Sequence, residues 1–368
     1  MDFNTKELQS AIGKLKGLIN TKSPYPAIRG VLYADGNLRA TDMNVHAKVS
    51  VSTGLISTDE KFIIPEIAFN AIGKLSAQTT NIETDVKNNI VVSSGKFKTT
   101  FASFDPKDFP TTENVEYAVS ADILFAEFVN ALDAVSYATS IDEKKGVLCG
   151  VNIASNGVDI IMTALDGFRA ATAKFDCPQL KTFIANVPDG FWKALAKISS
   201  GEEKVTFSVA EGGKNVSVKG EQFEVITRTL EGQFPDVAKI INGVNPDKSV
   251  TVTKDDILHA LDLHSAAIKD SGANNLVVLT VNAEESALVF SARSEVSNFK
   301  FEISAECDGF DAPFTIGFNS RYLTDAIKAL NAEDIRINLK APVAATLVHN
   351  ADKPDSAVAL VLPVRING

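Results

Sequence analysis

The feature that most constrains this chain is a structural pattern that occurs more than once along it. Residues 323–330 place their apolar side chains on one face at helical spacing, and residues 335–339 then alternate apolar and polar side chains as a half-buried strand does. The same succession of helix and strand occurs at 187–209 and again from 65–75 onward. A chain that repeats such a unit is expected to fold as a set of similar modules.

Longer units, each beginning with a helix, start near Phe3, Ser120 and Thr253. The chain therefore holds three copies with a period of roughly 120 to 130 residues, which is longer than the period of solenoid repeats. Each copy has its own predicted helices and apolar strands, so we expect the copies to be domains.

Linkers rich in turn-forming or charged residues fall near 113–117 and 242–248. They divide the chain into three expected domains, at 1–117, 118–247 and 248–368. Each domain is predicted to pack two helices on antiparallel sheet, which is an α+β fold.

Composition limits the class of protein. The 368 residues carry a formal net charge of -10, which argues against an overall basic surface for nucleic acid but leaves room for a local basic face. No apolar run approaches the roughly 20 residues of a membrane span, and the N-terminus has no signal-peptide pattern, so we expect a cytoplasmic protein with no membrane partner. Cys149, Cys177 and Cys307 lack paired spacing and are expected to be packing residues.

The sequence contains no recognisable catalytic motif of the Walker, Gly-x-Ser-x-Gly or His-Glu-x-x-His type. His259 and His264 are five residues apart on a predicted helix, so they point in different directions and do not favour a zinc pair. Asp255 and Asp256 fit the start of a helix, where acidic side chains meet the positive end of the helix dipole. We expect no catalysis, no cofactor and no metal site.

Several predicted helices carry cations on the side opposite their apolar stripe. These cations are Lys6, Lys74, Lys193, Lys197, Arg321 and Lys328. For any one of them, a solvated helix face is the simpler interpretation. Because they recur at equivalent places in repeated units, symmetry would bring them onto one surface, which would suit a phosphate backbone without reading bases.

Two short stretches are less ordinary. Asp166-Gly167-Phe168-Arg169 follows a predicted strand with a turn signal. Leu362-Pro363-Val364-Arg365 puts a proline and apolar residues near an end, where many chains fray. Either stretch could be a structural turn or an edge strand, and composition alone does not decide between them.

The order and spacing of these motifs resemble the beta subunit of bacterial DNA polymerase III, the sliding-clamp family, over essentially the full length. The resemblance also rests on Glu231-Gly232-Gln233-Phe234-Pro235-Asp236 and Phe318-Asn319-Ser320-Arg321-Tyr322-Leu323. It implies a head-to-tail homodimer of three-domain subunits, a six-domain ring around duplex DNA, with helices lining the hole and sheets forming the wall. Such a ring is a DNA replication processivity factor that tethers the polymerase without chemistry of its own.

The resemblance implies which residues face the DNA. Lys22, Lys74 and Lys197 match DNA-facing positions of the family, and Lys144 and Lys145 lie in a loop that would reach the duplex. Together with the helix cations, the expected lining is Lys6, Lys22, Lys74, Lys144, Lys145, Lys193, Lys197, Arg321 and Lys328. A closed ring can hold DNA through weak contacts that do not depend on sequence.

The family also has a pocket between its second and third domains, which takes a short apolar motif of the replicative polymerase subunit, the clamp loader and other clamp-motif proteins. By position, the lining here would be Leu148, Leu165, Gly167, Phe168, Arg169, Ala170, Pro235, Lys239, Ile240, Asn319, Tyr322, Val343, Ala345, Leu360, Leu362, Pro363, Val364 and Arg365.

That lining departs from the family pattern at several positions. Phe168 replaces a histidine, Ala170 a leucine, Leu165 a threonine, and Leu362 and Val364 replace methionines. Because methionine lends a binding site adaptability, these changes would narrow or reshape the peptide preference.

At the ring seam, the resemblance implies that an edge strand of the first domain faces the third domain of the other subunit. The residues implied on the two sides are Lys96, Lys98, Thr99 and Phe101, and Ala267 and Ile268, with charge pairing to Glu295.

Two other classes of function stay open at this point. One is a protein-binding scaffold of the same fold that no longer encircles DNA, and the weak basic faces of the third and fifth predicted helices motivate it. The other is an enzyme with an unrecognised site. The eukaryotic and archaeal type of clamp is disfavoured, because it builds six domains from three two-domain subunits, whereas this chain has three domains.

Overall fold

The computed structural model describes residues 1–53, 60–111, 115–178, 180–199, 201–268 and 275–366. Its contacts group the chain into two compact units. Unit 1 comprises Met1–Phe125 with Val187–Thr229, and unit 2 comprises Ala126–Asn186 with Leu230–Gly368. The middle third of the chain is therefore divided between the two units, each of which also contains one of the outer thirds.

Unit 1 contains two sheets and three α-helices among the described residues. Its elements are β1 (Asp2–Asn4), α1 (Thr5–Leu15), β2 (Gly30–Ala34), β3 (Asn37–Thr41), β4 (Val45–Ser50), β5 (Phe62–Pro65), α2 (Glu66–Ile72), β6 (Thr79–Thr84), β7 (Ile90–Ser94), β8 (Phe97–Phe101), β9 (Tyr117–Leu124), α4 (Asp189–Ile198), β14 (Lys204–Ala210), β15 (Asn215–Lys219) and β16 (Phe223–Arg228).

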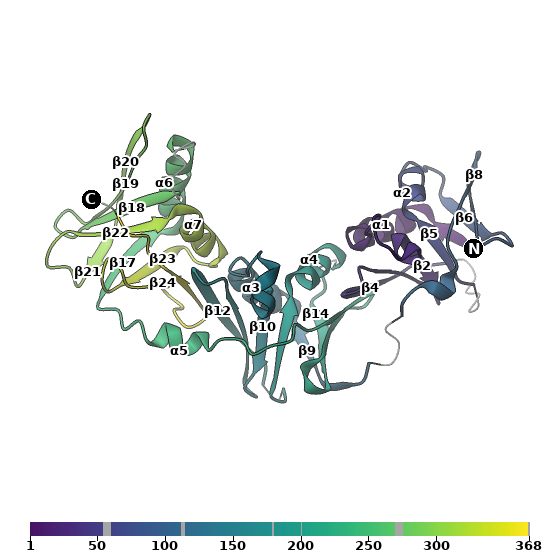
Figure 1. Ribbon diagram of the computed structural model, residues 1–368, viewed down its shortest axis with the longest axis horizontal. Helices are drawn as coiled ribbons and strands as arrows, with labels where there is room; N and C mark the ends of the chain where they lie inside the picture. The colour runs from purple at the N-terminus through teal and green to yellow at the C-terminus, as the bar shows by residue number, and fades with distance from the viewer. Residues whose placement is uncertain (54–59, 112–114, 179, 200, 269–274, 367–368) are drawn as a thin grey trace. The chain divides into compact units, whose positions relative to one another are not determined.

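The larger sheet of unit 1 has the strand order β5-β2-β3-β4-β16-β15-β14-β9 and the smaller has the order β1-β6-β7-β8. The antiparallel pairing of β4 with β16, which sets Val49 opposite Phe223, joins residues far apart in sequence into one sheet. Helices α1 and α4 contact each other, and both contact β4 of this sheet (Figure 1). The helices therefore cover the larger sheet.

The core of unit 1 contains an aromatic cluster of Phe3, Tyr33 and Phe62, each no more than 1% exposed. Their ring centroids lie 5.0 to 6.2 Å apart in edge-to-face and stacked pairs, which is the range that favours aromatic contacts. Directly after Phe3, the side chain of Asn4 accepts hydrogen bonds from the backbone N–H groups of Lys6 and Glu7 and so caps α1. The cap fixes where the helix starts over this core.

Unit 2 contains the remaining elements. They are α3 (Phe125–Ser136), β10 (Gly150–Ser155), β11 (Asp159–Leu165), β12 (Arg169–Asp176), β13 (Phe183–Pro188), α5 (Val237–Asn242), β17 (Lys248–Thr253), α6 (Lys254–Ala267), β18 (Leu276–Asn282), β19 (Ala287–Arg293), β20 (Asn298–Ser304), β21 (Glu306–Asp308), β22 (Phe314–Asn319), α7 (Ser320–Ala329), β23 (Asp334–Leu339), β24 (Thr346–Asn350) and β25 (Ala357–Val361). The division between the units falls at the first residue of α3 and within β13.

The larger sheet of unit 2 has the strand order β13-β10-β11-β12-β25-β24-β23-β17-β21 and the smaller has the order β20-β19-β18-β22. Helices α6 and α7 pack against each other, and α7 also contacts β24 and β25 (Figure 1). Their apolar faces, including Ile257, Leu261, Leu323 and Ile327, are buried in one core cluster. This core includes Ala359 and Val361 of β25, and the pairing of β25 with β12 builds the candidate site.

The structure corrects one expectation from the sequence and contains one helix that the sequence did not predict. The segment from Ser120 to Leu124, predicted as the start of a helix, belongs to strand β9, because Val119 and Ile123 are buried at strand spacing and β9 pairs with β14. The added element is the short helix α5, which Asp236 caps by accepting from the backbone N–H of Lys239.

Among the helices of the described residues, none combines the length and the apolarity that crossing a membrane requires. Cys177 is buried, whereas Cys149 and Cys307 are partly exposed.

Candidate functional site

The first of the two unusual stretches is a tight turn between β11 and β12. The carboxylate of Asp166 accepts hydrogen bonds from the backbone N–H groups of Phe168 (2.8 Å) and Arg169 (3.0 Å). Gly167, between them, has a φ of 96°, a left-handed conformation that favours glycine. The turn therefore fixes where the side chains of Phe168 and Arg169 leave the backbone.

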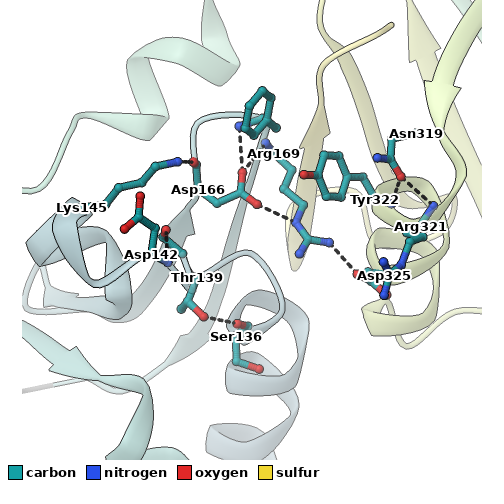
Figure 2. A network of polar contacts seen from close by, with 12 residues as sticks. Ser136, Thr139, Asp142, Lys145, Asp166, Arg169, Asn319, Arg321, Tyr322 and Asp325 are labelled. Carbon is teal, nitrogen blue, oxygen red and sulfur yellow. Dashed lines mark hydrogen bonds and ion pairs between the residues drawn. The ribbon is translucent and has the colours of Figure 1, made fainter. Parts of the chain in front are cut away.

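The guanidinium of Arg169 lies between two carboxylates (Figure 2). Its Nε donates to Asp166 at 3.0 Å, and one terminal nitrogen donates to Asp325 of α7 at 2.6 Å. The Arg169 and Asp166 side chains are each only 12% exposed, whereas that of Asp325 is 45% exposed. Burial alone would lower the pKa of Arg169, but the two carboxylates outweigh it and raise that pKa, so the cation persists.

Aromatic rings enclose the same guanidinium. Its central carbon lies 4.6 Å from the ring centroid of Tyr322 and 5.3 Å from that of Tyr137, within the range of cation–π attraction. Burial raises the pKa of the Tyr137 hydroxyl well above its ordinary value, although the charge of Arg169 acts in the opposite direction. Tyr137 therefore stays neutral.

A chain of stacked contacts leads from Arg169 to the surface. The ring of Tyr322 is nearly parallel to that of Phe168, with centroids 6.1 Å apart. The Lys145 ammonium lies 5.6 Å from the centroid of Phe168 and donates to the backbone carbonyl of Asp166 at 2.6 Å. Phe168 is 55% exposed, so one large aromatic side chain is held in place from below while part of its surface meets solvent.

Next to this stack, unit 2 has a small apolar cluster. Ala170, Val237, Leu347 and Leu360 are buried in it, and several partly exposed side chains pack on it, among them Leu165, Phe234, Ile241 and Ala345. Four exposed apolar side chains follow or precede members of the cluster by one or two residues: Phe168, Ile240, Val343 and Leu362. We call these four the apolar patch. Exposed apolar side chains that gather on one surface mark a binding site more often than scattered ones do.

The second unusual stretch lies against the same turn. Strand β25 pairs with β12, so Leu360 is opposite Ala170, and the backbone N–H of Leu362 donates to the carbonyl of Phe168 at 3.0 Å. The N–H of Val364 then donates to the carbonyl of Gly317 at 2.8 Å. A Cβ atom at Gly317 would come within 2.8 Å of the Val364 carbonyl oxygen, so glycine is needed for this approach. These bonds hold residues 362–364 against the fold.

Many of the residues predicted to line the pocket lie in or next to these features of unit 2, and that they line one pocket stays a prediction. Leu165, Gly167, Phe168, Arg169, Ala170, Ile240, Tyr322, Val343, Ala345, Leu360, Leu362 and Val364 belong to the turn, the stack, the cluster, the apolar patch or the C-terminal stretch described above. Asn319 caps α7 by accepting from the N–H groups of Arg321 and Tyr322. The others, which are Leu148, Pro235, Lys239, Pro363 and Arg365, lie in the same unit with partly or fully exposed side chains.

The cations predicted to face DNA are all exposed in their own units. Lys193 pairs with Asp189 one turn earlier on α4. Lys145 differs from the rest, because its ammonium contacts the Phe168 ring and the Asp166 carbonyl beside the apolar patch. That these residues contact DNA stays a prediction.

The residues predicted for the ring seam lie at sheet margins. Lys98, Thr99 and Phe101 are on β8, an edge strand of the smaller sheet of unit 1, and Lys96 is in the turn that precedes it. In unit 2, Ala267 is exposed at the end of α6, whereas Ile268 belongs to the core. Glu295 lies in the turn before β20, an edge strand of the smaller sheet of unit 2.

Sequence reasoning missed Tyr137 and Asp325, which complete the surroundings of Arg169. Asp325 follows Tyr322 by three residues, a spacing that puts both on neighbouring positions of a helix surface. That spacing was the available signal. Nothing in the sequence linked it to Arg169, which is 156 residues earlier.

Comparisons with known proteins show which family the chain resembles. The model of the central domain of the DNA polymerase III beta subunit matches residues 122–236, and the model of its C-terminal domain matches 244–365. The chain is 25% identical to the beta sliding clamp of Staphylococcus epidermidis over 316 residues, 85% of this chain and 80% of that protein. It is 26% identical to the beta sliding clamp of Bacillus subtilis over 298 residues, 80% of this chain and 77% of that protein.

Among solved structures, the DNA polymerase III beta subunit of Thermotoga maritima is similar, with a TM-score of 0.88 and 20% identity. The similarity covers 100% of this chain and 99% of that one. At that identity, the likeness is one of fold.

Proposed function

Because the chain belongs to the beta subunits of bacterial DNA polymerase III, the sliding clamps, we propose that it is a replication processivity factor that works as a ring around duplex DNA. It is a non-catalytic subunit of the polymerase holoenzyme. It tethers the polymerase to the template, and DNA, the polymerase and a second copy of the chain are its partners. A scaffold that no longer encircles DNA is not favoured.

The observation that carries this conclusion is the match of two successive beta-subunit domains in their proper order along the chain. The repeated α+β plan of the sequence fits a ring built from similar domains. We propose domain boundaries at 1–117, 118–247 and 248–368, and the matched ranges support the last two domains.

We propose that the apolar patch and the Phe168–Tyr322 stack form the pocket for a short apolar motif of the replicative polymerase subunit, the clamp loader and other clamp-motif proteins. The exposed apolar side chains suit such a motif, because a few apolar anchors in a shaped site supply most of the affinity of a short peptide. Phe168 presents a rigid ring where the family has a histidine, so a motif with an apolar or aromatic side chain is favoured at this point.

We propose that the ring closes through the open edge strands β8 and β20. Each has one neighbour in its sheet, so each has backbone groups available for pairing with a strand of another copy. Lys98 is exposed on β8 and Glu302 on β20, so their charges are complementary. The residues that would line the hole are Lys6, Lys22, Lys74, Lys144, Lys145, Lys193, Lys197, Arg321 and Lys328.

The test is retention on DNA. The protein is loaded with a bacterial clamp loader onto nicked circular DNA, its mass is measured by light scattering, and the circles are then cut. A dimer that stays on circles and leaves cut DNA supports the proposal. A monomer that never loads, or a protein that leaves circles and linear DNA equally fast, contradicts it.

The pocket is tested separately by deleting residues 362–368. The deletion removes Leu362 and the hydrogen bonds of Leu362 and Val364 to Phe168 and Gly317. We expect loss of polymerase binding with the dimer intact. Unchanged affinity for the polymerase would contradict the pocket assignment.

A further inference from the structure

The carboxylate of Asp325 binds the guanidinium of Arg169 beside the proposed pocket and is not part of the apolar patch. We infer that Asp325 is a positioning residue: through Arg169, it holds the Tyr322–Phe168 stack in the orientation that partners bind. The inference rests on the proposed pocket and adds a residue to it.

The first step is the electrostatic balance at Arg169. Its guanidinium is almost buried and has two carboxylate partners, Asp166 and Asp325 (Figure 2). Asp166 belongs to the same turn and also binds two backbone N–H groups there. Asp325 is the partner that comes from another element, α7, so it ties the guanidinium to the helix that carries Tyr322. Hydrogen bonds between ionised groups at 2.6 Å are short and strong.

The second step runs from Arg169 to the surface. The guanidinium lies 4.6 Å from the Tyr322 ring, and that ring stacks on Phe168. Without Asp325, one end of the guanidinium fork would lose its carboxylate, and the cation would be free to turn toward Asp166. Because a ring over a cation is held by the position of that cation, Tyr322 and then Phe168 would lose their fixed placement. A partner would then have to order both rings as it binds.

The third step is that Asp325 lines a hollow to which none of the four residues of the apolar patch contributes. Together with Leu258, Asp262, Arg321 and Lys328, it lines a hollow of about 390 Å³ between α6 and α7. An acidic side chain in that hollow would affect the binding of an apolar motif only indirectly, through Arg169. This location separates an effect on positioning from loss of direct contact.

The experiment measures the dissociation constant of the full-length dimer for the cognate DNA polymerase III catalytic subunit by surface plasmon resonance. Asp325→Asn keeps the shape of the side chain and removes its charge. We expect it to weaken binding about fivefold to tenfold, and Asp325→Glu to restore affinity to within about twofold of the unmodified protein. Asp262→Asn, which removes a charge from the same hollow, is the matched control and should leave affinity unchanged.

Thermal unfolding of each variant separates positioning from folding. A loss of affinity at an unchanged melting temperature, rescued by Asp325→Glu, supports the inference. Equal affinity of Asp325→Asn and the unmodified protein overturns it, and so does an equal loss in Asp262→Asn. Deletion of residues 362–368 tests the pocket itself: if that deletion does not weaken binding, the pocket proposal fails, whereas an effect of the deletion without an effect of Asp325→Asn removes only the role of Asp325.

Discussion

Unit 1 and unit 2 each contain a group of aromatic rings, and the two groups differ in what surrounds them. Phe3, Tyr33 and Phe62 are fully buried among apolar neighbours. Phe168 and Tyr322 stack beside two cations, Arg169 and Lys145, and Phe168 is more than half exposed. The first group stabilises the fold because its apolar surface is removed from water. In the second group, part of the apolar surface of Phe168 stays in water and is held in a fixed orientation. One arrangement stabilises a fold and the other preserves a binding surface.

The largest expected effect comes from breaking the buried group. Phe62→Ala leaves a cavity beside Phe3 and Tyr33, and we expect it to lower the free energy of unfolding of unit 1 by about 3 to 5 kcal/mol. Urea unfolding followed by the fluorescence of Trp192, the single tryptophan of the chain and a residue of unit 1, measures this directly. A change in the free energy of unfolding below about 1 kcal/mol would show that the buried rings contribute little to the stability of unit 1.

Breaking the exposed group should give the opposite pattern. Phe168→Ala removes a ring that is already half in water, so the melting temperature should change little, while affinity for the polymerase subunit falls about tenfold or more. Val86→Ala, a truncation at a fully exposed apolar residue elsewhere, is the control. If Phe168→Ala lowers the melting temperature as much as Phe62→Ala does, the exposed group stabilises the fold as the buried group does.

A smaller effect is expected from acid, which should lower the stability of the fold before it changes the affinity of the binding surface. Burial lowers the pKa of His264 in unit 2 and of His46 in unit 1 below the ordinary value of 6.5. Each histidine is therefore protonated more readily in the unfolded chain, so its stabilising contribution is complete above about pH 6.5 and declines as the pH falls below that value. We expect the melting temperature to fall between pH 7 and pH 5.5.

The described ring and cation contacts of Phe168 and Tyr322 involve no histidine, so polymerase affinity should stay constant between pH 8 and pH 6.5. Melting curves and binding measured across the same pH series, with His264→Gln as the variant that reduces the acid effect, check both statements. An acid effect on affinity that precedes any loss of folded protein would count against them.

The smallest effects are expected at two lysines. Lys193→Ala removes an exposed pair within one helix, so stability should change by less than about 0.5 kcal/mol and polymerase affinity should not change. Lys145→Ala removes a cation from the stack and should weaken polymerase binding about twofold to threefold. Equal effects of the two substitutions on affinity would show that Lys145 acts only as one more surface charge.

The fold could be predicted from sequence to the extent that local periodicity encodes it. The buried face of α7 follows from the spacing of Leu323, Ala326 and Ile327. The segment before Phe125 was misassigned, because a strand that runs directly into a helix offers apolar residues that fit both periods. The helix α5 is only six residues long, too short for a periodic signal.

The candidate site was predictable only where a motif marked it. The turn at Gly167 and the C-terminal stretch stood out as residues, but the pairing of Arg169 with Asp325 depends on the tertiary fold, which brings α7 beside the start of β12. No local pattern contains that information. The division into two compact units has the same origin, because pairing of β4 with β16 and of β12 with β25 joins strands that are distant in sequence.

The open margins of β8 and β20 have a consequence for the behaviour of the protein in solution. A strand that is unpaired on one side can pair with any compatible strand. A head-to-tail contact that does not close into a ring then adds copies without limit. Polymerisation into fibres is thus the alternative to a closed pair, and the same backbone groups would drive both outcomes. Substitutions that alter the angle of this contact are expected first to make a solution of the protein turbid, even where they lie far from the residues that would contact DNA or the polymerase.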